Sequence, residues 1–189
     1  NLVQTLEGVP ALIHGGPFAN ISHGCNTVIA TKASAGFGDV TVTEAGFGAD
    51  LGAEKFLDIK CRKAGIWPDC VVIVSTVRAL KYNAGIAREN LAECNPDAVS
   101  AGFANLARHI SNMKNFGLPV VVAANRFASD SDDELAVMEE NCGKLGASFA
   151  AADIFAKGGK GGLELASKVI AAFDSKNSGP RYTYELSDS

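Results

Sequence analysis

Acidic and glycine residues stand together just after one β-favouring run of the sequence. Glu44 follows the run 40–43, and Gly46 and Gly48 come shortly after it. A carboxylate at the end of a strand suits Mg²⁺ bound to a nucleotide, and glycines let the backbone approach a phosphate closely. The other interpretation is that Glu44 belongs to the solvated start of a helix, where acidic side chains are also favoured, and spacing alone favours that interpretation.

An amide side chain and two aromatic rings lie in later segments that also follow apolar runs. Asn125 follows the most apolar run of the chain, and its side chain can donate and accept hydrogen bonds in one plane, as recognition of a purine edge requires. Phe127 and Phe155 each stand in a segment expected to be a loop after a strand, where exposed rings can clamp a flat ligand. Asn125 is equally typical of a turn, and either ring could be an ordinary packing contact.

The segment 157–162 is rich in lysine and glycine, as phosphate-binding loops are. It lacks the spacing G-x-x-x-x-G-K-[ST], however, and no other segment of the 189 residues has it. We therefore expect the phosphate-cradling loop of an ATP-using enzyme to lie elsewhere in a longer chain, or these residues to be unable to turn over ATP. The first residue is not Met, and the last residues favour β structure without a closing element, so we expect a fragment of a larger protein.

The elements that must position these residues follow from the periodicity of the chain. Short apolar runs, several of them rich in β-branched residues, predict strands at 9–13, 40–43, 70–76, 119–124 and 147–151. Longer amphipathic stretches predict helices at about 25–37, 49–64, 97–116, 131–145 and 162–173. This alternation predicts a three-layer α/β fold with a mostly parallel sheet and helices on both faces, in which ligands collect at the carboxyl ends of the strands.

The expected helix at 131–145 has the clearest local signals. Asp130 or Ser131 can cap its first turn, and Leu135, Met138 and Cys142 are spaced to share one face. We therefore expect this helix to pack on the sheet through that face.

Composition excludes several classes of function. Hydrophobic residues make up 47% and charged residues 20% of the chain, as is typical of a globular domain. A net charge of -4 leaves no general basic surface for nucleic acid or anionic lipid, and no apolar run approaches the roughly 20 residues of a membrane span. The five cysteines have no C-x-x-C spacing, which favours reduced, mostly buried thiols in a cytoplasmic protein over disulfides or a zinc site.

Long uninterrupted motifs give the sequence a family resemblance over essentially all of its 189 residues. The chain resembles formate–tetrahydrofolate ligases through PALIHGGPFANI at 10–21, TEAGFGADLGAEKF at 43–56, DIKCR at 58–62 and VSTVRALKYNAG at 74–85. Some positions depart from the family pattern. Ser75 and Ala84 replace a usual Ala and a usual Gly, while Ala128 stands where Pro is common and Phe155 where Trp is common.

The resemblance implies a P-loop NTPase-like fold and an ATP-dependent ligase. Formate would attack the γ-phosphate of MgATP to give formyl phosphate, and N10 of tetrahydrofolate would then attack the formyl carbon. It also implies a monovalent cation, small-molecule substrates only and a homo-oligomeric enzyme. The family's Gly-Lys-Thr loop and the arginine expected to hold formyl phosphate have no counterpart in these residues. We expect 1–189 to form one α/β unit in which 1–116 is the nucleotide and formyl phosphate side and 117–189 the folate side.

Transferred residue by residue, the resemblance places Phe127 and Phe155 on either side of the pterin, with Ala128 beside them. Asn125 would lie near the nucleotide and formyl phosphate, and the same ligands would be bordered by a loop that contains Gly15, Gly16, Pro17, Phe18 and Asn20. Glu44 as a ligand of Mg²⁺ remains our own inference from the position of the carboxylate.

Two other functions are kept as alternatives. A non-catalytic folate-binding or assembly module would retain the two rings and dispense with ATP chemistry. A ligase of the dethiobiotin-synthetase type would explain Glu44 and its glycines but would leave Phe127 and Phe155 without a role. A Gly-Lys-Thr loop upstream in the same reading frame would favour the formate–tetrahydrofolate ligase.

Overall fold

The computed structural model describes residues 1–13, 25–46, 48–174 and 179–188. The chain forms two compact units. Unit 1 consists of Asn1–Trp67 together with Tyr182–Ser189, and unit 2 of Pro68–Arg181. The expected functional division between residues 116 and 117 falls inside unit 2, and it stays a prediction.

Unit 2 is built on a parallel sheet of three strands in the order β3-β4-β5. The strands are β3 (Val71–Ser75), β4 (Val120–Asn125) and β5 (Ser148–Ala152). Ile73 pairs with Val122, and Val122 pairs in turn with Phe149, so the three apolar runs lie in register. The sequence predicted all three strands within two residues, because each is a short, nearly uninterrupted apolar run.

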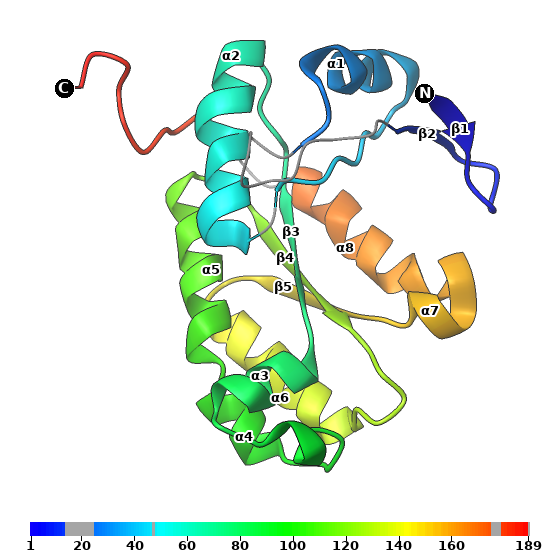
Figure 1. Ribbon diagram of the computed structural model, residues 1–189, viewed down its shortest axis with the longest axis vertical. Helices are drawn as coiled ribbons and strands as arrows, with labels where there is room; N and C mark the ends of the chain where they lie inside the picture. Colours follow the sequence, from blue (N-terminus) through cyan, green and yellow to red (C-terminus); the bar gives the residue numbers. More distant parts are fainter. Residues whose placement is uncertain (14–24, 47, 175–178, 189) are drawn as a thin grey trace. The chain divides into compact units, whose positions relative to one another are not determined.

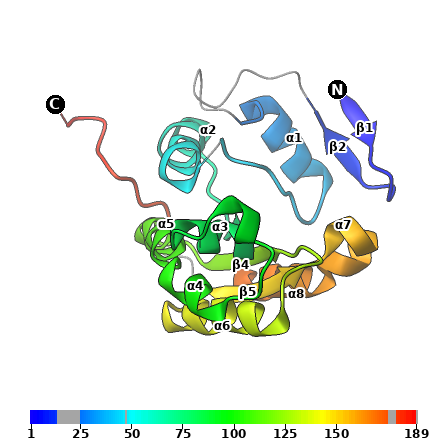
Figure 2. The same ribbon diagram turned by 60° about the horizontal axis from the view of Figure 1, so that its bottom comes forward.

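Helices cover both faces of this sheet, as expected for an α/β fold. Figure 1 shows α5 (Ala104–Asn115) on one side of the strands and α8 (Leu163–Phe173) on the other. α6 (Asp132–Lys144) packs on β5, and α4 (Pro96–Ala101) packs against α6, as Figure 2 shows. The remaining helices of the unit are α3 (Val77–Asn83), η3 (Arg88–Asn90), α7 (Ile154–Lys157) and η4 (Gly158–Gly162).

The core of unit 2 lies around the central strand. Residues 120–124 of β4 are all buried, and Ile110 and Met113 of α5 are fully buried as well. The apolar face predicted for the helix at 131–145 is confirmed, because Leu135, Met138 and Cys142 are all buried. Its predicted cap is confirmed too: Ser131 is the N-cap and forms a reciprocal capping box with Glu134.

Unit 1 contains a short antiparallel pair, β1 (Leu2–Gln4) with β2 (Pro10–Leu12), and α1 (Val28–Phe37). Two π-helical segments, η1 (Gly48–Gly52) and η2 (Lys55–Cys61), are followed by one α-helical turn, α2 (Arg62–Ala64).

The segment 182–188 contacts η2 and α2. Thr183 donates backbone and hydroxyl hydrogen bonds to Asp58, over 3.0 and 2.5 Å. The Arg62 guanidinium lies 3.8 Å from the ring centroid of Tyr182 and 4.7 Å from that of Tyr184. Residues separated by more than a hundred positions thus complete unit 1.

Two of the five predicted parallel strands are wrong. Residues 10–12 do form a strand, but it pairs antiparallel with β1 in a separate two-stranded sheet. Residues 40–43 form no strand, and the side chain of Val42 is 88% exposed. The β-branched residues there give β propensity, but that propensity is decided by packing against neighbours, which Val42 lacks.

Several helix boundaries also differ from the predictions. The expected helix at 97–116 is divided into α4 and α5 at Gly102, where a Cβ would lie 1.8 Å from the carbonyl oxygen of Leu80. No helix was predicted between the strand at 70–76 and the helix at 97–116, but Val77–Asn83 forms α3, which Thr76 caps by accepting a hydrogen bond from the Ala79 amide over 3.0 Å. Only glycine permits the approach of α3 to the α4–α5 junction, and this contact ends α4.

Candidate functional site

The carboxyl ends of the three parallel strands bring together the residues that the sequence singled out in unit 2. β3 leads into α3, β4 leads through residues 126–131 into α6, and β5 leads into α7. Asn125 is the last residue of β4 and is exposed. It pairs in register with Ala152, the last residue of β5. This edge is where open parallel sheets bind ligands.

Phe127 and Phe155 follow neighbouring strands, and both have exposed rings. Phe127 is 37% exposed and Phe155 is 100% exposed. Phe155 lies in the short helix α7 rather than in the loop that the sequence analysis expected. The exposed surface of both rings is therefore accessible to a ligand. Their role as a pair that holds one ligand stays a prediction.

The turn that carries Phe127 is held by its own polar groups. The Phe127 amide donates a hydrogen bond to Asp130 Oδ2 over 2.9 Å, and the Asp130 amide donates one to the carbonyl oxygen of Phe127 over 3.0 Å. Ala128 lies exposed in this turn, where the family pattern has Pro. The two hydrogen bonds close the turn without proline, so Ala128 leaves the ring supported.

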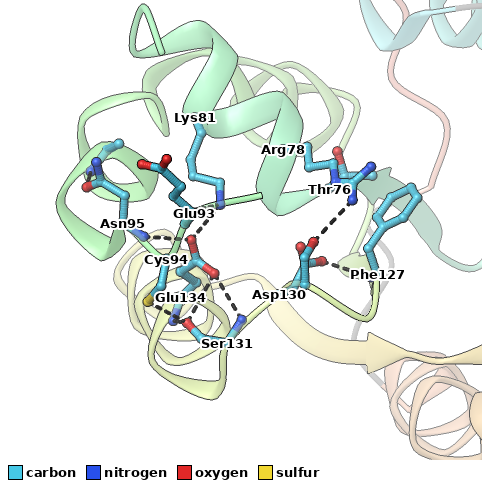
Figure 3. Close-up of polar contacts among 12 residues, drawn as sticks. Thr76, Arg78, Lys81, Glu93, Cys94, Asn95, Phe127, Asp130, Ser131 and Glu134 are labelled. Carbon is cyan, nitrogen blue, oxygen red and sulfur yellow. Dashed lines mark hydrogen bonds and ion pairs between the residues drawn. The ribbon is translucent and has the colours of Figure 1, made fainter. Parts of the chain in front are cut away.

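Arg78 is a residue of this edge that the sequence analysis did not single out. It belongs to α3, and its guanidinium carbon lies 4.3 Å from the centroid of the Phe127 ring (Figure 3). Its Nη2 donates a hydrogen bond to Ser129 Oγ over 3.1 Å. The contact joins residues 49 positions apart, and no local pattern predicts such a pairing.

A second group of contacts anchors α3 to the start of α6. The sequence analysis did not predict these contacts either. Lys81 Nζ donates a hydrogen bond to Glu134 Oε1 over 2.7 Å, and both side chains are fully buried (Figure 3). The Asn95 amide also donates to Oε1, while the amide and hydroxyl of Ser131 donate to Oε2. The spacing Ser131-x-x-Glu134 is a capping-box signal that the sequence does contain. No local sequence pattern predicts that Lys81 pairs with Glu134.

The Glu134 carboxyl is held in its charged form. Burial by itself raises the pKa of Glu134, but the hydrogen bonds from Lys81, Ser131 and Asn95 favour the carboxylate and outweigh it. The pKa of Glu134 therefore lies below its ordinary value of 4.5. A charged, fully hydrogen-bonded pair of this kind fixes geometry, which makes it a structural support for the edge rather than a proton donor.

The predicted nucleotide-side residues belong to unit 1. Glu44 is exposed, and its role as a ligand of Mg²⁺ stays a prediction. Gly48 has a φ of +78°, and a Cβ on Gly52 would lie 1.8 Å from the carbonyl oxygen of Gly46. Gly48, the first residue of η1, therefore has a backbone conformation that favours glycine, and glycine at position 52 is required by the approach of the Gly46 carbonyl, whether or not a phosphate binds there. The predicted residues Gly15, Gly16, Pro17, Phe18 and Asn20 lie outside the described residues.

Within the described residues, no group of three or more histidine, cysteine or acidic side chains could hold a metal ion by itself. A Mg²⁺ that arrives with ATP needs only one or two protein carboxylates, because the phosphates supply other ligands. Glu44 fits that smaller requirement. In the same part of the chain, no helix is long and apolar enough to cross a membrane.

The glycine-rich segment 157–162 also has a conformational explanation. Gly158–Gly162 forms the short helix η4, and a Cβ on Gly161 would lie 2.1 Å from the carbonyl oxygen of Asp153. The Asp153 amide donates a hydrogen bond to the carbonyl oxygen of Gly161 over 3.0 Å. At Gly161, then, glycine is required by a close approach of two backbone segments.

Comparison with protein families gives the wider context of these positions. The family model described as formate–tetrahydrofolate ligase matches residues 1–189. The match covers both units, including the edge that carries Asn125 and Phe127 and the turn that carries Glu44. The chain belongs to the formate–tetrahydrofolate ligase family.

Proposed function

We propose that this chain supplies the folate-binding edge and part of the nucleotide-binding surface of an enzyme that makes 10-formyltetrahydrofolate. Its family is one of ligases that act on formate and tetrahydrofolate. The observation that supports the assignment best is the position of two exposed rings, Phe127 and Phe155, after the carboxyl ends of neighbouring parallel strands. ATP and tetrahydrofolate both carry heterocycles that could stack on such rings, and the family resemblance assigns Phe127 and Phe155 to the pterin of tetrahydrofolate.

The proposed reaction has two steps. An oxygen of formate attacks the γ-phosphorus of MgATP, and the bond to ADP breaks to give formyl phosphate. N10 of tetrahydrofolate then attacks the formyl carbon, the bond to phosphate breaks, and N10 loses its proton. The protein's contribution to such chemistry is mainly positioning of the reactants and neutralisation of charge.

In this scheme Glu44 helps to hold the Mg²⁺ that accompanies ATP, and Asn125 lies near the nucleotide. Because the G-x-x-x-x-G-K-[ST] spacing does not occur in these 189 residues, the phosphate-cradling loop comes from another part of the enzyme. The contacts with Mg²⁺ and the ATP phosphates would then be divided between that loop and unit 1.

Titration of tetrahydrofolate into the protein and into its Phe127→Ala variant tests the folate-binding edge. Loss of one stacked ring should weaken binding by about 1–3 kcal/mol, by analogy with bases stacked on aromatic side chains. The affinity for MgATP should stay the same. If the Phe127→Ala variant melts normally and binds tetrahydrofolate as tightly as the unmodified protein, the edge is not the folate site.

The role of Glu44 is tested in the complete enzyme. A Glu44→Gln variant should lose about tenfold or more in kcat, because the neutral amide holds Mg²⁺ less well against the charge that develops on the phosphates. Steady-state rates over a range of Mg²⁺ concentrations check this. An unchanged kcat at every concentration would return Glu44 to the role of a residue at the solvated start of a helix.

A further inference from the structure

The Phe127 ring has two unlike sides. The Arg78 guanidinium lies over the ring at 4.3 Å from its centroid, so a cation covers one face. The ring is nevertheless 37% exposed, which leaves the rest of it open to a ligand. Figure 3 shows Arg78 and Phe127 facing each other at the end of β4. A ligand that stacks on this ring would complete a layered arrangement of guanidinium, benzene ring and ligand.

The Arg78 guanidinium has few polar contacts within the described residues. None of the ion pairs found among the described residues includes Arg78. Its Nε is buried and has no hydrogen-bond partner within that same part of the chain, and its Nη2 is bonded only to the neutral hydroxyl of Ser129. The guanidinium is thus a cation placed directly against the Phe127 ring, while the Asp130 carboxylate of the same turn is bonded to the Phe127 amide.

Both partners are fixed in advance. Lys81 lies one turn after Arg78 on α3, and its fully buried pair with Glu134 ties α3 to the start of α6. On the other side, the hydrogen bonds between Phe127 and Asp130 close the turn that carries the ring. The guanidinium and the ring therefore meet without a ligand, and little side-chain freedom remains to be lost on binding.

A cation on one face of an aromatic ring draws π electrons toward itself. The opposite face becomes less negative and stacks more favourably on an electron-rich ring system. The reduced pterin of tetrahydrofolate is electron-rich, because its pyrimidine carries amino nitrogens and its second ring is saturated. The pterin of folic acid is fully oxidised and poorer in electrons.

We propose that Arg78 is a positioning and specificity-determining residue that fixes the plane of Phe127 and polarises its ring in favour of reduced over oxidised folates. This inference rests on the proposed function, in which Phe127 stacks on the pterin. It adds a residue and a basis for selectivity that stacking alone does not supply.

The test compares the affinities of tetrahydrofolate and folic acid for the protein and three variants. Arg78→Met keeps the length of the side chain and removes its charge, while Arg78→Lys keeps a cation and loses the flat guanidinium. The matched control is Arg88→Met, because Arg88 lies 5.6 Å from the ring centroid of Tyr82 in the same unit. Melting temperatures confirm that each variant is folded.

We expect Arg78→Met to bind tetrahydrofolate about two- to tenfold more weakly, because the Phe127 ring must then be immobilised on binding and is no longer polarised. The affinity for folic acid should fall less than that for tetrahydrofolate. The ratio of the tetrahydrofolate affinity to the folic acid affinity therefore falls. Arg78→Lys should restore part of that ratio, and Arg88→Met should leave it unchanged. An unchanged affinity of Arg78→Met, or an equal loss for both ligands, would overturn the proposal.

The Phe127→Ala variant in the same titration separates this inference from the function on which it rests. If Phe127→Ala weakens tetrahydrofolate binding and Arg78→Met does not, the folate site stands and the role of Arg78 is wrong. If Phe127→Ala binds as well as the unmodified protein, the folate site itself is wrong.

Discussion

At the scale of single residues, the two exposed rings differ in their support. Phe127 is backed by Arg78 and held in a hydrogen-bonded turn, whereas Phe155 is fully exposed on the short helix α7. Phe155 also stands where the family commonly has Trp. The natural ring is therefore smaller than usual at the less supported of the two positions.

Phe155→Trp should preserve or strengthen tetrahydrofolate binding, because the larger ring offers more stacking area and the exposed position has room for it. Phe155→Ala should weaken binding. Calorimetric titration with MgATP as the control ligand measures both effects. A weaker affinity of Phe155→Trp would show that the site is adapted to the smaller ring, with Ala128 in the neighbouring turn as part of that adaptation.

The cysteines differ in reactivity for reasons of burial. Burial raises the pKa of Cys61 and of Cys142 to about 12, whereas Cys94 is exposed. At pH 8 only about one in ten thousand of the two buried thiols is ionised, and the thiolate is the form that reacts.

We expect iodoacetamide at pH 8 to label Cys94 in the folded protein and to leave Cys61 and Cys142 unmodified. Mass spectrometry of tryptic peptides, before and after denaturation in urea, gives the comparison. Labelling of Cys142 in the folded protein as fast as Cys94 would contradict the burial that the structure assigns to it.

At the scale of elements, the buried pair of Lys81 and Glu134 is the main connection between α3 and α6. Removing one partner leaves an uncompensated buried charge, whereas replacing both by apolar residues leaves none. We expect Lys81→Met to lower the free energy of unfolding by about 3–5 kcal/mol. The double variant Lys81→Met/Glu134→Leu should recover part of that loss, and urea unfolding measures both. Equal stability of the single variant and the unmodified protein would show that the pair is dispensable.

The same pair sets a pH dependence. Because the pKa of Glu134 is lower in the folded protein than its ordinary value of 4.5, the stability that Glu134 contributes is fully present above about pH 4.5. It is lost as the pH falls through the lower, folded-state pKa. Unfolding free energies measured between pH 7 and pH 3 should therefore fall more steeply for the unmodified protein than for the double variant. Parallel curves would mean that other carboxylates account for the acid sensitivity.

The elements also show which features a sequence can reveal. The strands β3, β4 and β5 were predicted because each is a continuous apolar run, and the cap at Ser131 because capping is local. The π-helical turns of residues 48–61 and the break at Gly102 depend on backbone segments that approach each other, which periodicity does not encode. At the site, the position of Phe127 after a strand was visible in sequence. Its pairing with Arg78 was not, because tertiary contacts decide it.

At the scale of the whole molecule, unit 2 is continuous in sequence and unit 1 is not. Unit 2 contains the parallel sheet and its own buried core, so residues 68–181 should fold when expressed alone. Circular dichroism and a single cooperative thermal transition would show this. Residues 1–67 expressed alone should lack a cooperative transition, because the partners of Asp58 and Arg62 lie at 182–184. A cooperative transition of residues 1–67 would show that these contacts are unnecessary.

The contacts of the segment 182–188 with η2 and α2 also impose an order on biosynthesis. Asp58 and Arg62 leave the ribosome before Thr183 and the two tyrosines that they contact, which are made more than a hundred residues later. At about 5–20 residues per second this delay is on the order of ten seconds, during which the parallel sheet is translated and can fold. Until then Asp58 and Arg62 lack these contacts, so unit 1 is completed only after the parallel sheet of unit 2 has been made.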